Sequence, residues 1–575
     1  MNLGDRASQY YGSDLVVDYL RAVGIEFVSI NAGATLRGLH DSLLRVGDPA
    51  LISTLHEEIA VGIAHGYAKS AGKPMAAAVH DHVGPLHAHM ALYNAWADDV
   101  PMLVLGGSGP RDTAMRRPWI DWIHTSSPTA APVRDAVKWD CEPASIEAIV
   151  PSLSRAYREA VAVPPGPVFV ALDVQLQEQA TSEPPSLARP IVPSPPVAAA
   201  DRIEWLVDRL LDARAPLFVV DRPPPGTMES LVRLANLLSA GVVDLGSRCS
   251  FPTTHWADQT ESRSEALAEA DVVVAIDPRD LLWTVTAVDE RDRSLETLVQ
   301  PDSLVISLGT TATRSTVPVD RGGEFAGAHH LVGHAPAVLA LAADLAESFP
   351  RRWSTSRGER RALLTDRWRA SRDANREAAV AAARSTPIHP AHLGLCLAQA
   401  VADGPWQLSN GLLGGWLRRL WDFESETSYL GRSGGEGLGY GLPSSVGASL
   451  AHQGDDTLVV DLQSDGDLLY TPQALWTAAH HRLPLLVVVY DNRAYGRDLV
   501  HQRLVAANRG RAGSGRPEGV VIGDPAIRFD ALAESFGVET RGPVEDPSVL
   551  QGLLGEAAGI VRDERRPMLV HVVSS

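Results

Sequence analysis

Two oxygen-bearing side chains in the C-terminal part of the chain, Asp465 and Asn492, are the residues best suited to chemistry. Each follows an apolar segment, residues 457–460 and 485–490, and a helix-like stretch separates the two segments. Parallel strands buried on both faces have such continuous apolar sequences, and ligands bind at their carboxyl ends. We therefore expect both side chains at one edge of a sheet. Their oxygens suit Mg²⁺, whose coordination is usually completed by phosphate and water, so the pair predicts a magnesium diphosphate site.

The same residues carry a resemblance to a known family. The sequence SDGD at residues 464–467, followed one helix and one strand later by DN at 491–492, is similar to the signature of thiamine diphosphate (ThDP)-dependent enzymes. The resemblance implies ThDP and Mg²⁺ as cofactors. It assigns metal and cofactor binding in this stretch to Asp465, Gly466, Asp467, Asn492 and, through its backbone carbonyl, Ala494.

A helix-like segment at residues 55–68, LHEEIAVGIAHGYA, carries a second match. The family has its catalytic glutamate in a pattern Glu-x-x-x-x-Gly-x-x-x-Gly-Tyr-Ala. The chemistry needs this acid, because ThDP becomes a nucleophile only when C2 of its thiazolium loses a proton. A carboxyl group bonded to N1′ of the aminopyrimidine promotes the tautomer that takes that proton. Glu58 is a competitor, but the spacing to Gly66 favours Glu57 as the catalytic residue.

A third match is the Gly-rich segment at residues 433–448, SGGEGLGYGLPSSVGA. Glycines permit close approach of the backbone to a ligand. The resemblance implies that Leu438 wedges ThDP into a bent conformation and that the carbonyl of Gly437 accepts a hydrogen bond from the 4′-amino group. The turn expected to contact the diphosphate consists of Ser409, Asn410 and Gly411.

Residues 79–101 and 137–145 look most similar to the branch of the family that contains benzoylformate decarboxylase and acetolactate synthase. His80 falls where benzoylformate decarboxylase has a catalytic histidine. Because histidine titrates near neutrality, we expect His80 and His82 to transfer protons. Ala34 stands where that enzyme has an active-site serine, and its methyl group cannot bond a substrate carboxylate. Neither named enzyme is therefore a close match.

The histidines also permit a different interpretation. His80, His82, His87 and His89 form an H-x-H-x₄-H-x-H cluster of the kind that binds transition metals. The first pair follows an extended segment, on which alternate residues share a face. The alternative function is a zinc or iron hydrolase, which would leave the three ThDP motifs unexplained. Otherwise we expect His87 and His89 to be hydrogen-bonding residues near a helix start.

The remaining pocket candidates come from two segments. Residues 119–124 occupy the region where relatives contribute substrate contacts, and residues 495–501 follow the metal turn, where relatives build the other wall. The expected substrate-pocket residues are Ala34, Trp122, His124, Tyr495 and Arg497.

Composition limits the possible partners and compartment. A net charge of −19 over 575 residues argues against nucleic acid or an anionic membrane as partner. Three cysteines predict a reducing compartment without a disulfide framework. The chain shows neither a signal peptide at its start nor an apolar run long enough to span a membrane, so we expect a cytoplasmic protein.

Apolar strand-like runs alternate with helical stretches in three successive parts, which predicts an α/β protein. The plan matches three consecutive doubly wound α/β domains of the ThDP-enzyme type. The three domains are a pyrimidine-binding domain at 1–180, a central domain at 201–355 and a diphosphate- and Mg-binding domain at 386–575. A Pro-rich linker at 181–200 and a helical connector at 356–385 join them. The first central strand runs into the stiff turn at residues 221–226, which is unsuited to wrapping a diphosphate and makes FAD unlikely.

The resemblance implies a 2-oxo acid decarboxylase or carboligase that forms a ThDP enamine. The acyl anion equivalent is then transferred to a carbonyl acceptor, giving an acyloin or acetolactate-type product. Alternatives are a simple decarboxylase that releases an aldehyde, and a catalytically silent ThDP-binding subunit. In the family, the domains of Glu57 and Asp465 come from different subunits. We therefore expect a homodimer or homotetramer with active sites at the subunit interface.

Overall fold

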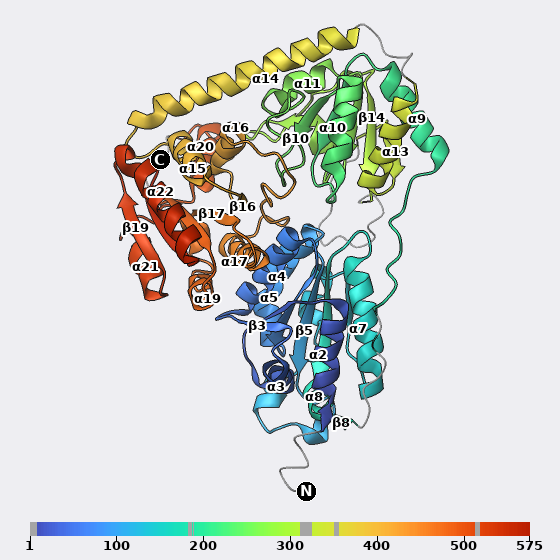
Figure 1. The fold of residues 1–575 in the computed structure, drawn as a ribbon, viewed down its shortest axis with the longest axis vertical. Coiled ribbons are helices and arrows are strands. Elements are labelled where there is room, and N and C mark those ends of the chain that lie inside the picture. The colour runs from blue at the N-terminus through green and yellow to red at the C-terminus, as the bar shows by residue number, and fades with distance from the viewer. Residues whose placement is uncertain (1–8, 182–186, 188, 311–324, 350–355, 512–517) are drawn as a thin grey trace.

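The computed structural model describes residues 9–181, 187, 189–310, 325–349, 356–511 and 518–575. The chain forms three α/β units, drawn in blue, green and orange to red in Figure 1. Each unit contains one sheet whose strands all run parallel, with helices packed against it. The predicted α/β class with three consecutive units is confirmed.

The first unit has a six-stranded sheet in the order β3-β2-β4-β5-β7-β6. Its strands are β2 (Phe27–Ile30), β3 (Ala50–Ser53), β4 (Met75–His80), β5 (Met102–Ser108), β6 (Trp139–Cys141) and β7 (Pro167–Asp173). Its helices are α2 (Gly12–Val23), α3 (Arg37–Val46), α4 (Glu57–Ala71), α5 (Val83–Ala97), α6 (Ile120–His124), α7 (Ile146–Val161) and α8 (Val174–Glu178). The short strands β1 (Tyr10–Tyr11) and β8 (Ala180–Thr181) pair antiparallel where the unit begins and ends.

The second unit has a five-stranded sheet in the order β10-β9-β11-β14-β15. Its strands are β9 (Pro216–Val220), β10 (Gly241–Asp244), β11 (Val272–Ile276), β14 (Leu304–Gly309) and β15 (His329–Val332). Its helices are α9 (Ala200–Asp212), α10 (Thr227–Leu238), α11 (Arg263–Glu269), α12 (Leu281–Val285) and α13 (Ala335–Glu347). A hairpin of β12 (Thr286–Val288) and β13 (Leu295–Thr297) extends from it.

The third unit has a five-stranded sheet in the order β16-β17-β18-β20-β19. Its strands are β16 (Trp406–Asn410), β17 (Leu458–Ser464), β18 (Leu485–Asp491), β19 (Glu539–Val544) and β20 (Met568–Val573). Its helices are α15 (Pro390–Val401), α16 (Trp416–Leu420), α17 (Gly441–Ala451), α18 (Asp465–Leu468), α19 (Ala474–His480), α20 (Gly496–Asn508), α21 (Phe529–Ser535) and α22 (Pro547–Glu564).

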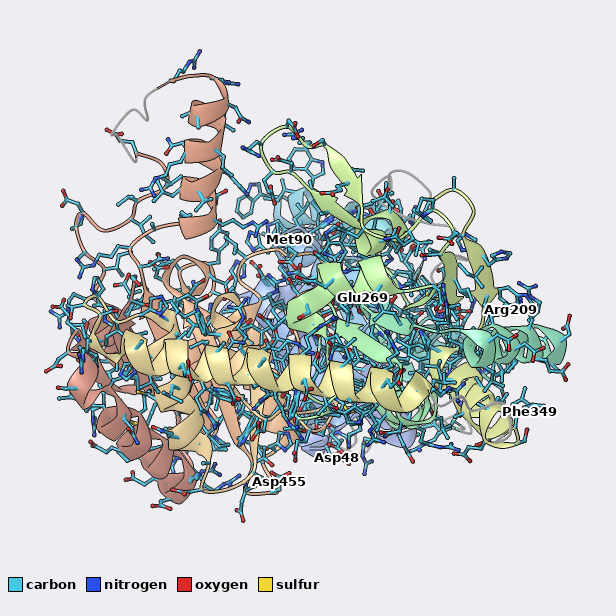
Figure 2. The ribbon with its side chains drawn as sticks, turned by 90° about the horizontal axis from the view of Figure 1, so that it is seen from above. Asp48, Met90, Arg209, Glu269, Phe349 and Asp455 are labelled. Atoms are coloured by element: carbon cyan, nitrogen blue, oxygen red, sulfur yellow. The ribbon has the colours of Figure 1, made fainter. Side chains whose placement is uncertain are left out.

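A single long helix, α14 (Ser356–Ala381), joins the second unit to the third. Figure 1 shows it spanning both units at the top of the molecule, and Figure 2, seen from above, shows it lying across them. This helix lies within the range predicted for the connector, 356–385. The exact domain limits stay a prediction; residues 182–186 and 188 of the predicted linker, and 350–355 beside the limit at 355, lie outside the described residues.

A buried charge cluster lies where the three units meet. The Asp98 carboxylate, after α5, accepts from Lys69 Nζ at 2.8 Å and lies 2.9 Å from His65 Nε2, both on α4. Arg222, which follows β9 in the second unit, lies 3.6 Å from the same carboxylate. Lys69 also donates to the carbonyls of residues 431–432, which precede the Gly-rich loop of the third unit. Burial by itself raises the pKa of the Asp98 carboxyl group. The charges of Lys69 and Arg222 outweigh this effect and hold that pKa well below its usual range.

Among the described residues, no helix is long and apolar enough to cross a membrane. All three cysteines, Cys141, Cys249 and Cys396, are free thiols.

Candidate active site

Close packing of α4 on α17 brings the two predicted halves of the cofactor site together. An added Cβ on Gly66 of α4 would lie 1.9 Å from the Ser444 carbonyl oxygen, and one on Gly447 of α17 would lie 2.0 Å from the Ile63 oxygen. Only glycine permits this approach, because any side chain would overlap backbone atoms. The two halves therefore pack together within the chain that the structure describes, and the expected active site at a subunit interface stays a prediction.

Glu57 begins α4 and lies buried beside α5. Its side chain is 8% exposed, and its Oε2 lies 3.3 Å from Nδ1 of His87. Gly84 at the start of α5 lies beside it, since an added Cβ there would stand in ordinary contact with Glu57 Cγ, at 3.5 Å. The predicted catalytic carboxyl is thus held at the junction of α4 and α5.

The neighbouring Glu58 points instead at the Gly-rich loop. Its Oε1 lies 3.0 Å from where a Cβ on Gly439 would stand, and Gly439 has a φ of +90° that strongly favours glycine. Burial, and then the charge of Asp467, raises the pKa of Glu58 to about 7. The structure therefore places a second carboxyl at this site, which the sequence had suggested as the competitor of Glu57.

The Gly-rich loop before α17 is fixed from both units. Asn94 of α5 donates from Nδ2 to the Gly437 carbonyl at 3.3 Å and accepts from the Gly437 N–H at 3.1 Å. Asp467 accepts from the Gly439 N–H at 2.6 Å. Between these anchors Leu438 stays 38% exposed, as a bulky apolar side chain presented to a ligand would be.

The predicted metal ligands meet at the carboxyl ends of β17 and β18. Asp465 Oδ2 and Asn492 Oδ1 both accept from the Ala494 N–H, at 3.2 and 3.0 Å, so the two oxygens converge on one point. Burial, and then the nearby Asp491, raises the pKa of Asp465 to about 6. A buried carboxylate and an amide oxygen at one sheet edge form a donor set suited to Mg²⁺.

The turn after β16 forms the floor of this region. Ser409 Oγ donates to the Val460 carbonyl, and Asn410 Nδ2 donates to Asp461 and Gln463. Gly411, with φ +77°, leaves no room for a Cβ, which would lie 2.2 Å from the Leu462 oxygen. These bonds hold the predicted diphosphate turn against β17. Burial raises the pKa of Asp461 beneath it to about 7, and its Oδ2 has no hydrogen-bond partner among the residues that the structure describes.

His80 and His82 leave the end of β4 in different directions. His80 Nδ1 lies 2.8 Å from Thr35 Oγ1 and its Nε2 lies 3.3 Å from His124 Nδ1. His82 Nδ1 lies 3.0 Å from Ser126 Oγ. The structure thus brings together two of the predicted residues, His80 and His124, and adds Thr35, which the sequence had not indicated.

The predicted histidine cluster does not assemble as a metal site. Among the described residues, the histidine–carboxylate group with metal-like spacing is His56, Glu57 and His87. His56 is the N-cap of α4, where its Nδ1 accepts from the Glu58 N–H. Because His80 and His82 have other partners, the metallohydrolase alternative loses its ligand set.

The other pocket candidates are dispersed. Ala34 begins a short helical turn beside His80 and is exposed. Trp122 is 74% exposed, and the Tyr495 ring packs on Gly466, 2.6 Å from where a Cβ would stand. Arg497 on α20 turns toward the β12–β13 hairpin, where its Nη2 lies 3.6 Å from Glu290. Only Tyr495 of the two C-terminal candidates therefore lies at the metal turn.

These features fit a bound ThDP with Mg²⁺. The glycines at 411, 439 and 441 form a cradle that side chains would fill, since a Cβ on Gly441 would lie 2.3 Å from Asn410 Nδ2. Asp465 and Asn492 offer hard oxygens for a metal that would neutralise a diphosphate. Glu57 and Glu58 offer carboxyl groups at the opposite side of the loop.

Comparison with known proteins supports this interpretation. Residues 11–126 match the thiamine pyrophosphate enzyme N-terminal TPP binding domain, and residues 409–572 match the C-terminal TPP binding domain. The fold resembles that of the ThDP-dependent 4-hydroxybenzoylformate decarboxylase of Rhodococcus jostii RHA1, with a TM-score of 0.75, 21% identity, and coverage of 98% of this chain and 99% of that one.

Two curated relatives extend over most of the chain. Benzoylformate decarboxylase of Pseudomonas aeruginosa is 27% identical over 526 residues, covering 90% of both chains. Acetolactate synthase of Bacillus subtilis is 24% identical over 575 residues, covering 94% of this chain and 90% of the relative. Both cofactor-binding domains, the site they form and these relatives lead to one conclusion: the chain belongs to the family of thiamine diphosphate-dependent enzymes.

Proposed function

We propose that this enzyme is a ThDP- and Mg²⁺-dependent carboligase that decarboxylates a 2-oxo acid and joins the remaining acyl unit to a carbonyl acceptor. The observation that carries the proposal is the junction of α4 and α17, which puts the Glu57 carboxyl and the loop of Leu438 at one site. When bound there, ThDP supplies a nucleophilic carbon and accepts the electrons left by departing CO₂.

The residues of the chain take four tasks in this proposal. Asp465 and Asn492, with the backbone of Ala494, hold Mg²⁺. The turn of Ser409, Asn410 and Gly411 and the residues Gly466 and Asp467 shape the diphosphate cradle. Gly437 and Leu438 orient the cofactor. Glu57 exchanges the activating proton with the cofactor, while His80 and His82 exchange protons with the substrate.

The proposed activity is tested by measuring CO₂ release from aliphatic and aromatic 2-oxo acids, with and without ThDP and Mg²⁺. We expect cofactor-dependent release that Glu57→Gln abolishes and Glu58→Gln only reduces. If Glu58→Gln abolishes release and Glu57→Gln does not, the role belongs to Glu58. ThDP binding without release from any acid would refute the decarboxylating function and favour a silent subunit.

A simple decarboxylase is the second candidate, and the similarity to benzoylformate decarboxylase favours it. Adding aldehyde acceptors to the same assay separates the two. A carboligase consumes the acceptor and forms a hydroxy ketone, whereas a simple decarboxylase releases the aldehyde of the donor acid. Ala34, which has no hydroxyl, makes us expect poor use of benzoylformate itself.

We also propose a homodimer or homotetramer that works in the cytoplasm without FAD. Trp119 and Trp122, 69% and 74% exposed beside the site, are apolar surface that a second copy would cover. The turn after β9 is filled by its own side chains, because Asp221 accepts from Ser247 and Arg279. Light scattering coupled to gel filtration, with an absorption spectrum of the peak, tests the assembly and the absence of flavin together.

A further inference from the structure

His80 is the middle member of a hydrogen-bonded chain of three side chains from separate elements. Thr35 lies in the turn after β2, His80 ends β4 and His124 ends α6. The Thr35 Oγ1 to His80 Nδ1 distance is 2.8 Å, and the His80 Nε2 to His124 Nδ1 distance is 3.3 Å. Both ring nitrogens of His80 therefore have a partner that can donate or accept.

Close packing fixes Thr35 and His80 in this arrangement. Thr35 is 1% exposed, and an added Cβ on Gly107 of β5 would lie 2.4 Å from its Oγ1. An added Cβ on Gly33 would lie 2.3 Å from His80 Cγ. The backbone of these two glycines therefore packs directly against the Thr35 hydroxyl and the His80 imidazole, so the hydrogen bond between them has little freedom to change.

The hydrogen bonds from Thr35 through His80 to His124 can form with the protons pointing in either direction. When Thr35 donates to His80 Nδ1, His80 donates from Nε2 to His124 Nδ1. When the protons are reversed, His124 donates to His80 and His80 donates to Thr35. Because a threonine hydroxyl and a neutral imidazole each carry one donor and one acceptor function, both arrangements leave no buried nitrogen unpaired.

We propose that Thr35 and His124 are positioning residues that make His80 the centre of a proton relay serving the Glu57 site. Protonated His80 donates from Nδ1 to Thr35 Oγ1 and gives its Nε2 proton to the substrate, which leaves a neutral ring. His80 Nε2 then accepts the proton of His124 Nδ1 while His124 takes a proton from solvent at its Nε2. One proton thus passes from solvent to the substrate, and exchange with solvent returns His124 to its first tautomer. The inference deepens the proposed decarboxylase or carboligase function and rests on it.

The charges around the His80 imidazole come from three directions. His124 faces it from α6, Glu57 from α4, and Arg117 from the segment before α6. Burial, and then His124, lowers the pKa of His80 below its ordinary value, whereas the Glu57 carboxylate opposes this. A His80 that is largely neutral near pH 7 can accept a proton, and its protonated form gives that proton up more readily than an ordinary histidine does.

Exchange of the imidazole C2 hydrogen for deuterium, read by mass spectrometry, measures the titration of His80 in the full-length protein without any substrate. We expect His124→Asn to raise the pKa of His80, because a charge that opposes its protonation is removed. Thr35→Val should lower it, because the imidazolium loses an oxygen acceptor, and Thr35→Ser should restore it. The matched controls are His89→Asn on α5 and Thr284→Val, whose buried hydroxyl bonds a backbone carbonyl in the second unit.

The same variants are then compared for ThDP-dependent CO₂ release across pH. Thr35→Val should lower the maximal rate at least tenfold and Thr35→Ser less than threefold, while His124→Asn shifts the acidic limb to higher pH. An unchanged His80 titration in both Thr35→Val and His124→Asn overturns the relay. Equal rates for Thr35→Val and the wild type overturn it as well. If the wild type binds ThDP but releases no CO₂, the proposed function fails, and the hydrogen exchange alone decides whether the relay exists.

Discussion

Replacing Gly66 by alanine tests the packing on which the whole site depends. The new Cβ would lie 1.9 Å from the Ser444 carbonyl oxygen, whereas ordinary contacts begin at 3.4 Å. The difference, 3.4 − 1.9, means that α4 and α17 must separate by about 1.5 Å. Overpacking of this kind costs roughly 1–3 kcal/mol or more, while alanine gains about 1 kcal/mol over glycine within a helix. Because the new Cβ meets backbone atoms, the cost should lie at the upper end of that range, and we expect a net loss of about 2 kcal/mol, 3 − 1, in the free energy of unfolding.

The loss of activity should exceed the loss of stability. Glu57 stands at the start of α4 and Leu438 just before α17, so the separation displaces one half of the site from the other. A displacement of about 1 Å can lower a rate on the order of 100-fold. We therefore expect Gly66→Ala to weaken ThDP binding in calorimetry and to reduce CO₂ release by about two orders of magnitude.

Gly559→Ala is the matched control, because the same substitution in α22 meets no atom within 4 Å. It should raise the free energy of unfolding by up to about 1 kcal/mol and leave ThDP binding unchanged. Both variants are compared with the wild type by urea unfolding followed by circular dichroism. If Gly66→Ala unfolds at the wild-type midpoint and binds ThDP as tightly, then α4 and α17 do not pack as described.

Three further predictions concern the loop, the unit interface and pH. Asn94→Leu removes both hydrogen bonds to Gly437 and should raise the Kd for ThDP roughly 5- to 100-fold in calorimetry; an unchanged Kd would show that the loop holds itself. Arg418→Leu removes the cation beside the buried Asp244 carboxylate, which then keeps, among the described residues, only backbone N–H donors. The free energy of unfolding should fall by about 3 kcal/mol, which wild-type stability in urea would contradict. Burial raises the folded-state pKa of Asp277 to about 7, so its contribution to stability is full below pH 3.8 and falls as pH rises to 7. The melting temperature should therefore fall less between pH 5 and 8 in Asp277→Asn than in the wild type, and parallel curves would argue against it.

The parallel strands could be predicted because their sequences report burial on both faces. The predicted apolar segments 457–460 and 485–490 overlap β17 (Leu458–Ser464) and β18 (Leu485–Asp491). The meeting of Asp465 and Asn492 follows from the same logic, because β17 and β18 are neighbours and end at one edge. Local sequence was sufficient wherever a site residue directly follows a buried strand.

The contacts that complete the site depend on packing between distant segments. Asn94 and Gly437 are 343 residues apart, and Thr35 and His80 are 45 apart, so no spacing rule relates them. The sequence predicts Arg497 in the pocket because it closely follows the metal turn. The direction of α20 instead places its side chain near Glu290. Helix direction after a turn is a tertiary property, and the sequence around Arg497 does not specify it.

Because of the charge cluster around Asp98, we expect only chains in which all three units have folded and docked to bind the cofactor. Lys69, Arg222 and the carbonyls before the Gly-rich loop come from three units, so a chain with one undocked unit leaves a buried charge uncompensated and the loop without its anchor. Such a chain offers no cradle and gains none of the stabilisation that a ligand gives to the native state alone. Newly made chains that have bound cofactor would thus be protected from proteolysis, and those with one immature unit would be removed first.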